Sequence, residues 1–224
     1  MRVELRDFKP VDYHVNEAYK TLMTNVRFCG SDNKVIAVTS CGPNEGKSTV
    51  ALNLAVTLAE SGKKVMLIDA DLRKSVLLGK IKVGRKVKGL SHFLSGQDEI
   101  GEVINETNIQ RLNIILVGPT PPNPPELLGN NRFKALIQGI RKVYDYVIID
   151  TPPVGSVIDG AIVADECDGA IMVIESKAVS YKYARKVKEQ VEKSGCSLLG
   201  VVLNKVDISN HKYYGKYHSE YKHA

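Results

Sequence analysis

The chain has no uninterrupted apolar stretch approaching the roughly 18 residues that a membrane-spanning helix needs. Its N-terminus, MRVELRDFKP, alternates charged residues and has no apolar signal core. Cysteine is scarce and scattered, at Cys29, Cys41, Cys167 and Cys196, with no Cys-x-x-Cys pair. That spacing argues against a disulfide framework and against a zinc site. We therefore expect a cytoplasmic protein that is neither exported nor membrane-spanning by itself.

The composition is that of one globular domain followed by a loose end. The 224 residues are 43% hydrophobic and 25% charged, which suffices for a full core. We expect the domain over residues 1–207 and a flexible tail over 208–224. The net charge of +6 comes largely from residues 73–88, which hold seven basic residues and no acid, and from lysines in the tail. A solvated charge run is favoured over an anion-binding surface, and no nucleic-acid partner is expected.

Apolar runs and helical periodicities alternate along the chain, a pattern typical of an α/β fold with a doubly wound, mainly parallel sheet flanked by helices. Residues 72–96 lack this pattern and are expected to form a weakly ordered connection with a short helix at 89–94. Strands are expected at 34–40, 64–69, 112–117, 144–150, 169–175 and 198–204, and helices at 13–29, 47–61, 99–106, 125–143 with a break at 129, 157–164 and 180–194. Ligands of such sheets bind beyond the carboxyl ends of the strands.

The segment after the first expected strand is a phosphate-binding loop of the P-loop NTPase type. The backbone N–H groups of the loop and the positive end of the following helix dipole attract anions. Lys47 is placed to meet terminal phosphates and Ser48 to meet a magnesium ion. One departure is Cys41, which stands where the usual pattern has its first glycine. The residues expected to bind the nucleotide are Gly42, Pro43, Asn44, Glu45, Gly46, Lys47, Ser48 and Thr49.

Three aspartates lie at the exits of two expected strands. Asp69 and Asp71 follow one strand with the same orientation, so they could hold hydrated magnesium or take a proton from a hydroxyl nucleophile. Asp150 ends an apolar strand before a Pro-Pro turn, as in a Walker B element that orients magnesium. Arg73 is expected to pair with one of these acids or with a phosphate. The alternative for each aspartate is a polar cap at a strand end.

These residues carry a resemblance to the bacterial tyrosine kinases of the BY-kinase family, in the cytosolic form associated with capsule or exopolysaccharide production. The resemblance covers nearly the whole chain, and its aspartate and Pro-Asn-Pro motifs are more specific than its phosphate loop. The motifs are GKST at 46–49, LIDADLR at 67–73, GPTPPNPPELL at 118–128, VIIDTPP at 147–153 and the tyrosine-rich end.

The resemblance implies ATP-dependent phosphorylation of tyrosines, on the chain's own tail and on other proteins, with ATP and Mg²⁺ as cofactors. It implies that Lys47 neutralises the β- and γ-phosphates and that Asp71 is the base for the tyrosine hydroxyl. Ser48, Asp69 and Asp150 would hold magnesium. Asn204, at the end of the last expected strand, suits recognition of the adenine edge as in similar folds, and a turn asparagine is an equally supported alternative.

The tail is the expected phosphoacceptor. It has almost no aliphatic side chains and is therefore expected not to pack. It holds four of the ten tyrosines, and phosphates there would reverse its basic charge. A disordered tail with another role is the alternative. The tyrosines are Tyr213, Tyr214, Tyr217 and Tyr221.

The resemblance also implies partners: a membrane adaptor that activates the kinase and recruits it to the inner face of the membrane, protein-tyrosine substrates, a cognate tyrosine phosphatase, and a homo-oligomer. Relatives carry Glu-x-x-Arg-x-x-Arg on the first helix, where this chain has Glu17, Lys20 and Met23. Lysine lacks the planar guanidinium fork and methionine has no charge, which argues against the ring-like oligomer unless Arg27 partly compensates.

Two other classes fit parts of the sequence. Partition and division-site ATPases share the P-loop sheet, but they usually place a second lysine early in the loop, where this chain has Gly42. An ATP-binding scaffold whose catalysis has lapsed is left open by Cys41 and by the altered first helix. The aspartate motif and the tyrosine tail favour the kinase.

Overall fold

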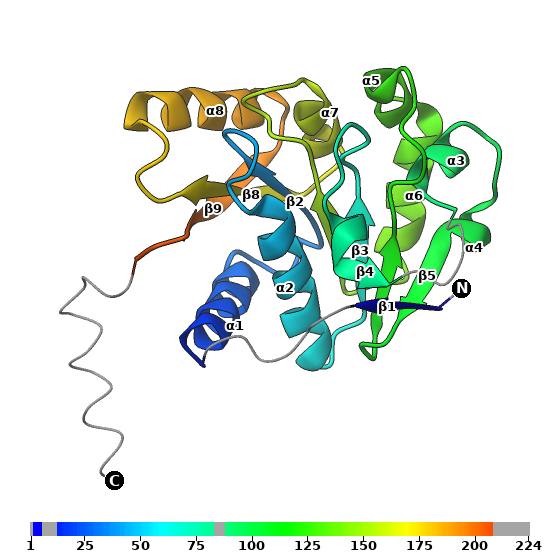
Figure 1. Cartoon of the computed structure of the whole chain (residues 1–224), viewed down its shortest axis with the longest axis horizontal. Helices are drawn as coiled ribbons and strands as arrows, with labels where there is room; N and C mark the ends of the chain where they lie inside the picture. The colour runs from blue at the N-terminus through cyan, green and yellow to red at the C-terminus, as the bar shows by residue number, and fades with distance from the viewer. Residues whose placement is uncertain (1, 6–12, 83–87, 208–224) are drawn as a thin grey trace, which may run out of the picture.

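A computed structural model describes residues 2–5, 13–82 and 88–207 of the chain. Strands and helices alternate through these residues (Figure 1). None of the described helices is long and apolar enough to cross a membrane. The strands are β1 (Arg2–Leu5), β2 (Val35–Ser40), β3 (Val65–Asp69), β4 (Ile81–Lys82), β5 (Ile104–Thr107), β6 (Leu112–Ile115), β7 (Tyr146–Asp150), β8 (Gly169–Glu175) and β9 (Ser197–Asn204). The helices are α1 (Tyr13–Phe28), α2 (Lys47–Glu60), the 3₁₀ turn η1 (Leu77–Lys80), α3 (Leu90–Leu94), α4 (Ile100–Val103), α5 (Pro124–Leu128), α6 (Asn131–Arg141), α7 (Asp159–Asp165) and α8 (Tyr181–Lys193).

The nine described strands form one sheet in the order β4-β1-β5-β6-β3-β7-β2-β8-β9. The run from β6 to β9 is parallel throughout, and only the β5–β6 and β1–β4 pairs are antiparallel. This arrangement confirms the predicted mainly parallel α/β fold. The register between β3 and β7 places Asp69 directly opposite Asp150, so two strand exits deliver carboxylates to the same point.

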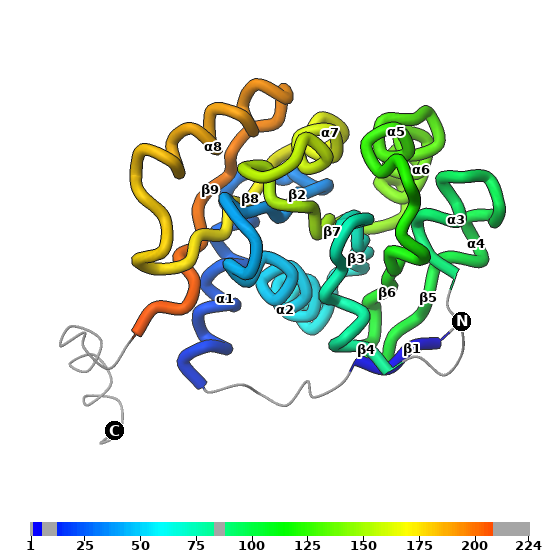
Figure 2. Tube along the Cα trace, turned by 45° about the horizontal axis from the view of Figure 1, so that its top comes forward, coloured from blue at the N-terminus to red at the C-terminus, as the bar shows by residue number. Residues whose placement is uncertain are grey.

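Helices cover both faces of the sheet. Figure 2 shows α1 and α2 on one side of the strands and α5, α6, α7 and α8 on the other. The central strands are buried on both faces, as parallel strands between helices are, and they read as continuous apolar runs for that reason. One core cluster joins α2 to the sheet, and two others lie under α6 and under α7 and α8.

Helix α1 packs on α2 rather than on the sheet itself. Its buried side is formed by Tyr19, Leu22, Met23 and Val26, which contact the core cluster under α2. Cys29, the last residue of the predicted helix, follows the end of α1 and is exposed. Met23 is one of the residues that pack against the core of its own chain.

Three short strands were missed, and they lie toward one edge of the sheet. The sequence predicted six strands, a helix across 99–106 and a weakly ordered connection across 72–96. Instead α4 ends at Val103 and β5 follows it immediately, and residues 77–82 form η1 and β4, which pairs with β1. Short polar edge strands lack the long apolar runs that identify the central ones. Residues 83–87 lie outside the described part of the chain.

Candidate functional site

The phosphate loop connects a fully buried strand, β2, to α2, whose first turn holds Lys47 and Ser48 in buried positions. The loop turns at two left-handed residues, Asn44 with φ 64° and Gly46 with φ 94°. A Cβ atom at position 46 would overlap the side-chain amide of Asn204, so only glycine fits there. The loop thus has the strand, turn and helix context that its motif predicts.

Cys41 does not disturb this loop. Its backbone is not among the described left-handed residues, so the position has no conformational need for glycine. The side chain is fully buried, with Sγ 3.9 Å from the sulfur of Met172. Burial raises the pKa of its thiol to about 11, which keeps it protonated and inert. Here Cys41 is a core residue.

Lys47 is the centre of a buried charge cluster at the ends of β2, β3 and β7. Its Nζ donates to Oδ2 of Asp71 at 3.0 Å, to Oδ1 of Asp150 at 3.3 Å and to Oγ of Ser48 at 3.2 Å. Burial lowers the pKa of Lys47, but Asp150 and Asp71 outweigh that effect and leave the pKa above its ordinary value. The lysine is therefore a fixed cation at the loop.

Asp69 and Asp150 are fully buried side by side on β3 and β7. Burial, with the neighbouring Asp150 charge, raises the pKa of Asp69 to about 8. Burial also raises the pKa of Asp150, against the lowering effect of Lys47. Asp69 accepts a hydrogen bond from the hydroxyl of Ser75. Two carboxylates buried this close together repel each other when both are ionised, so the site gains from additional positive charge.

One oxygen of this pair has no partner in the described part of the chain: Oδ2 of Asp150 is buried and accepts no hydrogen bond. An orphaned buried carboxylate oxygen beside Ser48 and Asp69 fits a magnesium ion. Among the described residues no three carboxylate, histidine or cysteine side chains gather as a metal cluster. A hydrated ion suits this sparse set, because magnesium keeps several of its waters.

The ends of β8 and β9 hold the phosphate loop from the side. Nδ2 of Asn204 donates to the carbonyl oxygen of Glu45 at 2.9 Å, and Nζ of Lys205 donates to that of Asn44 at 2.8 Å. The carboxylate of Glu45 accepts the N–H groups of Gly42 and Glu175, the latter at 3.1 Å. Sequence reasoning singled out Asn204 but missed Lys205 and Glu175, whose contacts join segments about 130 to 160 residues apart.

Arg73 pairs with an acid that the sequence did not indicate. Its guanidinium forms a two-point ion pair with the buried Asp159 of α7, at 2.8 and 3.0 Å. The expected pairing with Asp69 or Asp71 is therefore wrong, and Arg73 instead joins the segment after β3 to α7; a contact of Arg73 with a phosphate stays a prediction. Asp159 was missed because nothing in the local sequence distinguishes it from a surface acid.

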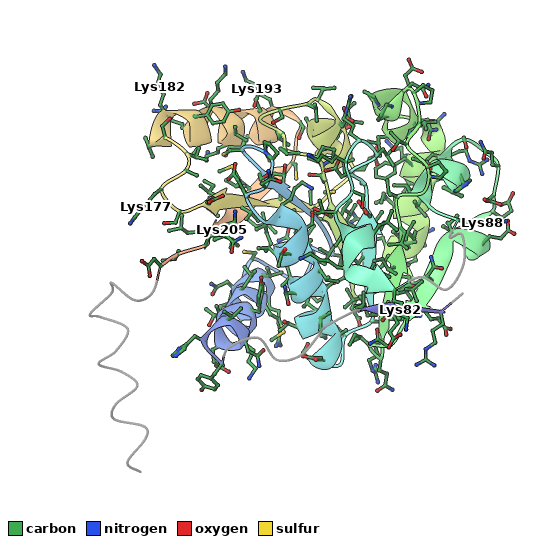
Figure 3. All side chains as sticks on the ribbon, in the orientation of Figure 1. Lys82, Lys88, Lys177, Lys182, Lys193 and Lys205 are labelled. Carbon is green, nitrogen blue, oxygen red and sulfur yellow. The ribbon has the colours of Figure 1, made fainter. Side chains whose placement is uncertain are left out.

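The basic segment is only partly a solvated run. Lys80, at the end of η1, is half-buried, and its Nζ donates to Oγ1 of Thr49 in the phosphate loop at 2.6 Å. Burial lowers the pKa of Lys80. Lys88 pairs with Asp98 and Glu102, and Lys82 is exposed (Figure 3). The solvated interpretation suits Lys82 and is wrong for Lys80.

The structure therefore brings together Lys47, Ser48, Asp69, Asp71 and Asp150, with the loop residues around them. The four tail tyrosines lie outside the described residues. Pro43 and Thr49 lie in the loop and the first turn of α2, as expected. Three strand exits and the phosphate loop thus form a single polar site.

The chain resembles proteins of known family. A model of an AAA domain matches residues 33–197. A tyrosine-protein kinase CpsD of Streptococcus agalactiae is 44% identical over 219 residues, which are 96% of each chain. The crystal structure of the chimerical protein CapA2B2 superposes with a TM-score of 0.79 and 33% identity, over 90% of this chain and 87% of that one. The septum site-determining protein MinD of Pyrococcus horikoshii, complexed with Mg-ADP, superposes with a TM-score of 0.67 and 26% identity, over 79% and 72%.

Proposed function

Because the chain belongs to the AAA-domain family and, within it, to the bacterial protein-tyrosine kinases, we propose that it transfers the γ-phosphoryl group of ATP to tyrosines of its own tail and of other proteins. The observation that carries this proposal is the buried cluster in which Lys47 contacts both Asp71 and Asp150 beside the phosphate loop. Phosphoryl transfer requires mainly positioning and charge neutralisation, and this cluster is built for both.

The phosphate loop, residues 42–49, is the proposed nucleotide cradle. Its N–H groups and the start of α2 would bind the phosphates, and Lys47 would neutralise the terminal ones. Ser48, Asp69 and Asp150 would hold magnesium, directly or through water. The ion, when bound, supplies positive charge that stabilises the transferring phosphoryl group.

Asp71 is the proposed base. Its Oδ1 accepts the N–H of Lys74 at 3.0 Å and its Oδ2 accepts the ammonium of Lys47, so the carboxylate is held at the edge of the cluster. It would take the proton of a tyrosine hydroxyl as that oxygen attacks. Asp69 is more deeply buried than Asp71, and burial raises its pKa. We therefore propose it as a magnesium ligand.

Asn204 is the proposed reader of the base. Its Nδ2 is used by the loop carbonyl of Glu45, which leaves Oδ1 as the atom to accept a hydrogen bond from the adenine amino group. Because Asn204 also packs on Gly46, the same side chain would contact both the phosphate loop and the adenine base. A turn asparagine without contact to the base is the alternative.

The proposed biological setting rests on the resemblance to the bacterial tyrosine kinases associated with capsule production. We propose that the folded domain covers residues 1–207 and that Tyr213, Tyr214, Tyr217 and Tyr221 on the following segment are phosphoacceptors. The kinase would regulate capsular or exopolysaccharide synthesis with a membrane adaptor that activates it and brings it to the inner face of the membrane, and with a tyrosine phosphatase that reverses it. A homo-oligomer is proposed without the ring contacts that need arginines on α1.

Intact-mass measurement after incubation with Mg-ATP tests the proposal. We expect additions of phosphate that map to the four tail tyrosines, and none in a variant with all four changed to phenylalanine. Release of free phosphate from an unmodified chain would instead indicate a nucleotide-switched ATPase of the partition or division type. Nucleotide binding with neither product would indicate a scaffold.

A further inference from the structure

A lysine that the proposed chemistry does not use links the end of β9 to the phosphate loop. Lys205 follows β9 directly, and its Nζ donates to the carbonyl oxygen of Asn44 and to Oε2 of Glu175, each at 2.8 Å. Asn44 lies inside the loop and Glu175 ends β8. One ammonium group therefore joins the loop to both strands at this edge of the sheet.

The two residues in contact share an unusual backbone. Lys205 has φ 55° and Asn44 has φ 64°, both in the left-handed region that residues other than glycine rarely adopt. Such conformations persist where surrounding contacts hold them, and they occur often at functional sites. The left-handed turn at Lys205 directs its side chain back toward the loop, where it meets the other left-handed residue.

Holding these carbonyl oxygens has a consequence for the N–H groups of the loop. A trans peptide is planar, so its N–H points opposite to its C=O. When Lys205 holds the oxygen of Asn44, the N–H of Glu45 points away from β9. Asn204 acts in the same way on the next peptide, because it holds the oxygen of Glu45 and so orients the N–H of Gly46.

We propose that Lys205 is a positioning residue of the nucleotide site. By holding the carbonyl of Asn44 it aims the N–H of Glu45 at the phosphates, and Glu175 keeps its ammonium in place. This inference rests on the proposed function, since it takes the loop to be the nucleotide cradle. Loss of the ammonium would leave the loop free to turn that peptide away, and phosphate binding would weaken.

The structure offers a matched control. Lys177, in the connection between β8 and α8, also has a left-handed backbone, with φ 62°. Its side chain points outward from that connection, whereas Lys205 lies over the ends of β8 and β9 (Figure 3). Lys177 has no hydrogen bond or ion pair to any described residue. Lys205→Met and Lys177→Met therefore each remove one positive charge from a residue with a left-handed backbone. Only Lys205→Met also removes a contact to the phosphate loop.

Titration of the full chain with a fluorescent ADP analogue and magnesium tests the inference, together with kcat and KM for ATP in tyrosine phosphorylation. Lys205→Met should raise the Kd and the KM about tenfold, the usual effect of losing one charged hydrogen bond, with kcat within about twofold of wild type. Lys177→Met should match wild type, and Lys205→Arg, which keeps a donor, should restore most of the affinity.

The outcomes separate this inference from the proposed function. A Lys205→Met chain that binds the analogue as wild type does would overturn the role of Lys205 and leave the kinase proposal intact. A wild-type chain that binds no nucleotide would overturn both. If thermal unfolding shows that Lys205→Met does not fold, Lys205→Arg decides: retained affinity supports the inference, and a loss as large as that expected for methionine overturns it.

Discussion

Nζ of Lys47 lies 3.0 Å from Oδ2 of Asp71, so the cation of the phosphate loop and the carboxylate beyond β3 form one buried ion pair. We propose that Lys47 neutralises the phosphates of ATP and that Asp71 is the base. The ion pair therefore places these two groups in direct contact. A nucleotide that draws on Lys47 would change the surroundings of Asp71 at the same time. Binding and proton transfer are thereby linked through two side chains.

Asp71→Asn separates these two roles, because it removes the base while keeping the size of the side chain. We expect kcat for tyrosine phosphorylation to fall by about 10²–10⁴, the usual contribution of a general base. Affinity for the ADP analogue should not fall, since Asp71 is not a proposed phosphate or metal ligand and its loss leaves Lys47 free to meet the phosphates. Single-turnover phosphotyrosine formation and analogue titration measure the two effects. Wild-type rates in the variant would remove Asp71 from the mechanism.

Lys47→Met should abolish phosphate transfer and leave a folded chain of lower stability. The variant lacks the cation proposed to meet the phosphates, and it leaves Asp71 and Asp150 buried without their partner, a loss of about 3–5 kcal/mol in comparable buried pairs. Circular dichroism and thermal unfolding check the fold, and phosphotyrosine detection checks activity. Lys177→Met serves as the control with both properties unchanged. Continued labelling of tyrosine in Lys47→Met would contradict the assigned role.

The central part of the fold could be predicted from the sequence because burial on both faces gives β2, β3, β7 and β8 continuous apolar runs. The short strands β1, β4 and β5 could not, since they carry no such run; β5, for example, reads Ile-Asn-Glu-Thr. Parallel pairing then explains why Asp69 and Asp150 could be expected together, as strand exits meet at one edge. A strand could thus be predicted wherever its own residues formed an apolar run.

The partners of the site residues could not be predicted in the same way. Arg73 meets Asp159, and Lys205 meets Asn44, across 86 and 161 positions. These contacts depend on how α7 and β9 pack around the sheet, which no local pattern encodes. The motifs of a chain indicate which residues approach a ligand, whereas tertiary packing decides which contacts hold those residues in place.

The raised pKa of Asp69 predicts how stability depends on pH. The folded chain keeps this proton up to about pH 8, whereas an unfolded aspartate releases it near pH 4. The folded state therefore binds more protons between these values, and Asp69 makes the free energy of unfolding fall as pH rises, by at most about 1.4 kcal/mol per pH unit.

Urea unfolding between pH 5 and pH 8 measures this dependence. Asp69→Asn cannot ionise, so it should show a smaller loss of stability over the same range. Added Mg-ADP should also reduce the slope in wild type, because a nearby divalent ion favours the ionised carboxylate. Equal slopes for wild type and Asp69→Asn, both without nucleotide, would contradict the raised pKa.

Cys41→Gly restores the usual loop pattern, and we expect it to bring no gain. The Cys41 side chain is fully buried against Met172, and its backbone is not left-handed. Glycine would lose this packing and add freedom to the unfolded chain, for a loss of about 1 kcal/mol or more. Affinity for the ADP analogue should stay within about twofold, since the N–H of the residue remains. Tighter binding in Cys41→Gly would show that the cysteine impairs the loop.

Gly155→Ala tests the contact between the phosphate loop and the segment after Asp150. A Cβ at position 155 would overlap the carbonyl oxygen of Cys41 and the hydroxyl of Tyr183, which itself donates to the carbonyl of Gly155 at 2.9 Å. Because the oxygen of Cys41 is a backbone atom, one of the two segments must move. We expect a loss of about 1–3 kcal/mol in the free energy of unfolding, as for other overpacked sites, and a higher KM for ATP.

Gly139→Ala in α6 is the control: a Cβ there meets open space, so alanine should stabilise by about 1 kcal/mol and leave KM unchanged. Equal KM values in the two variants would mean that the segment after Asp150 does not set the position of the loop.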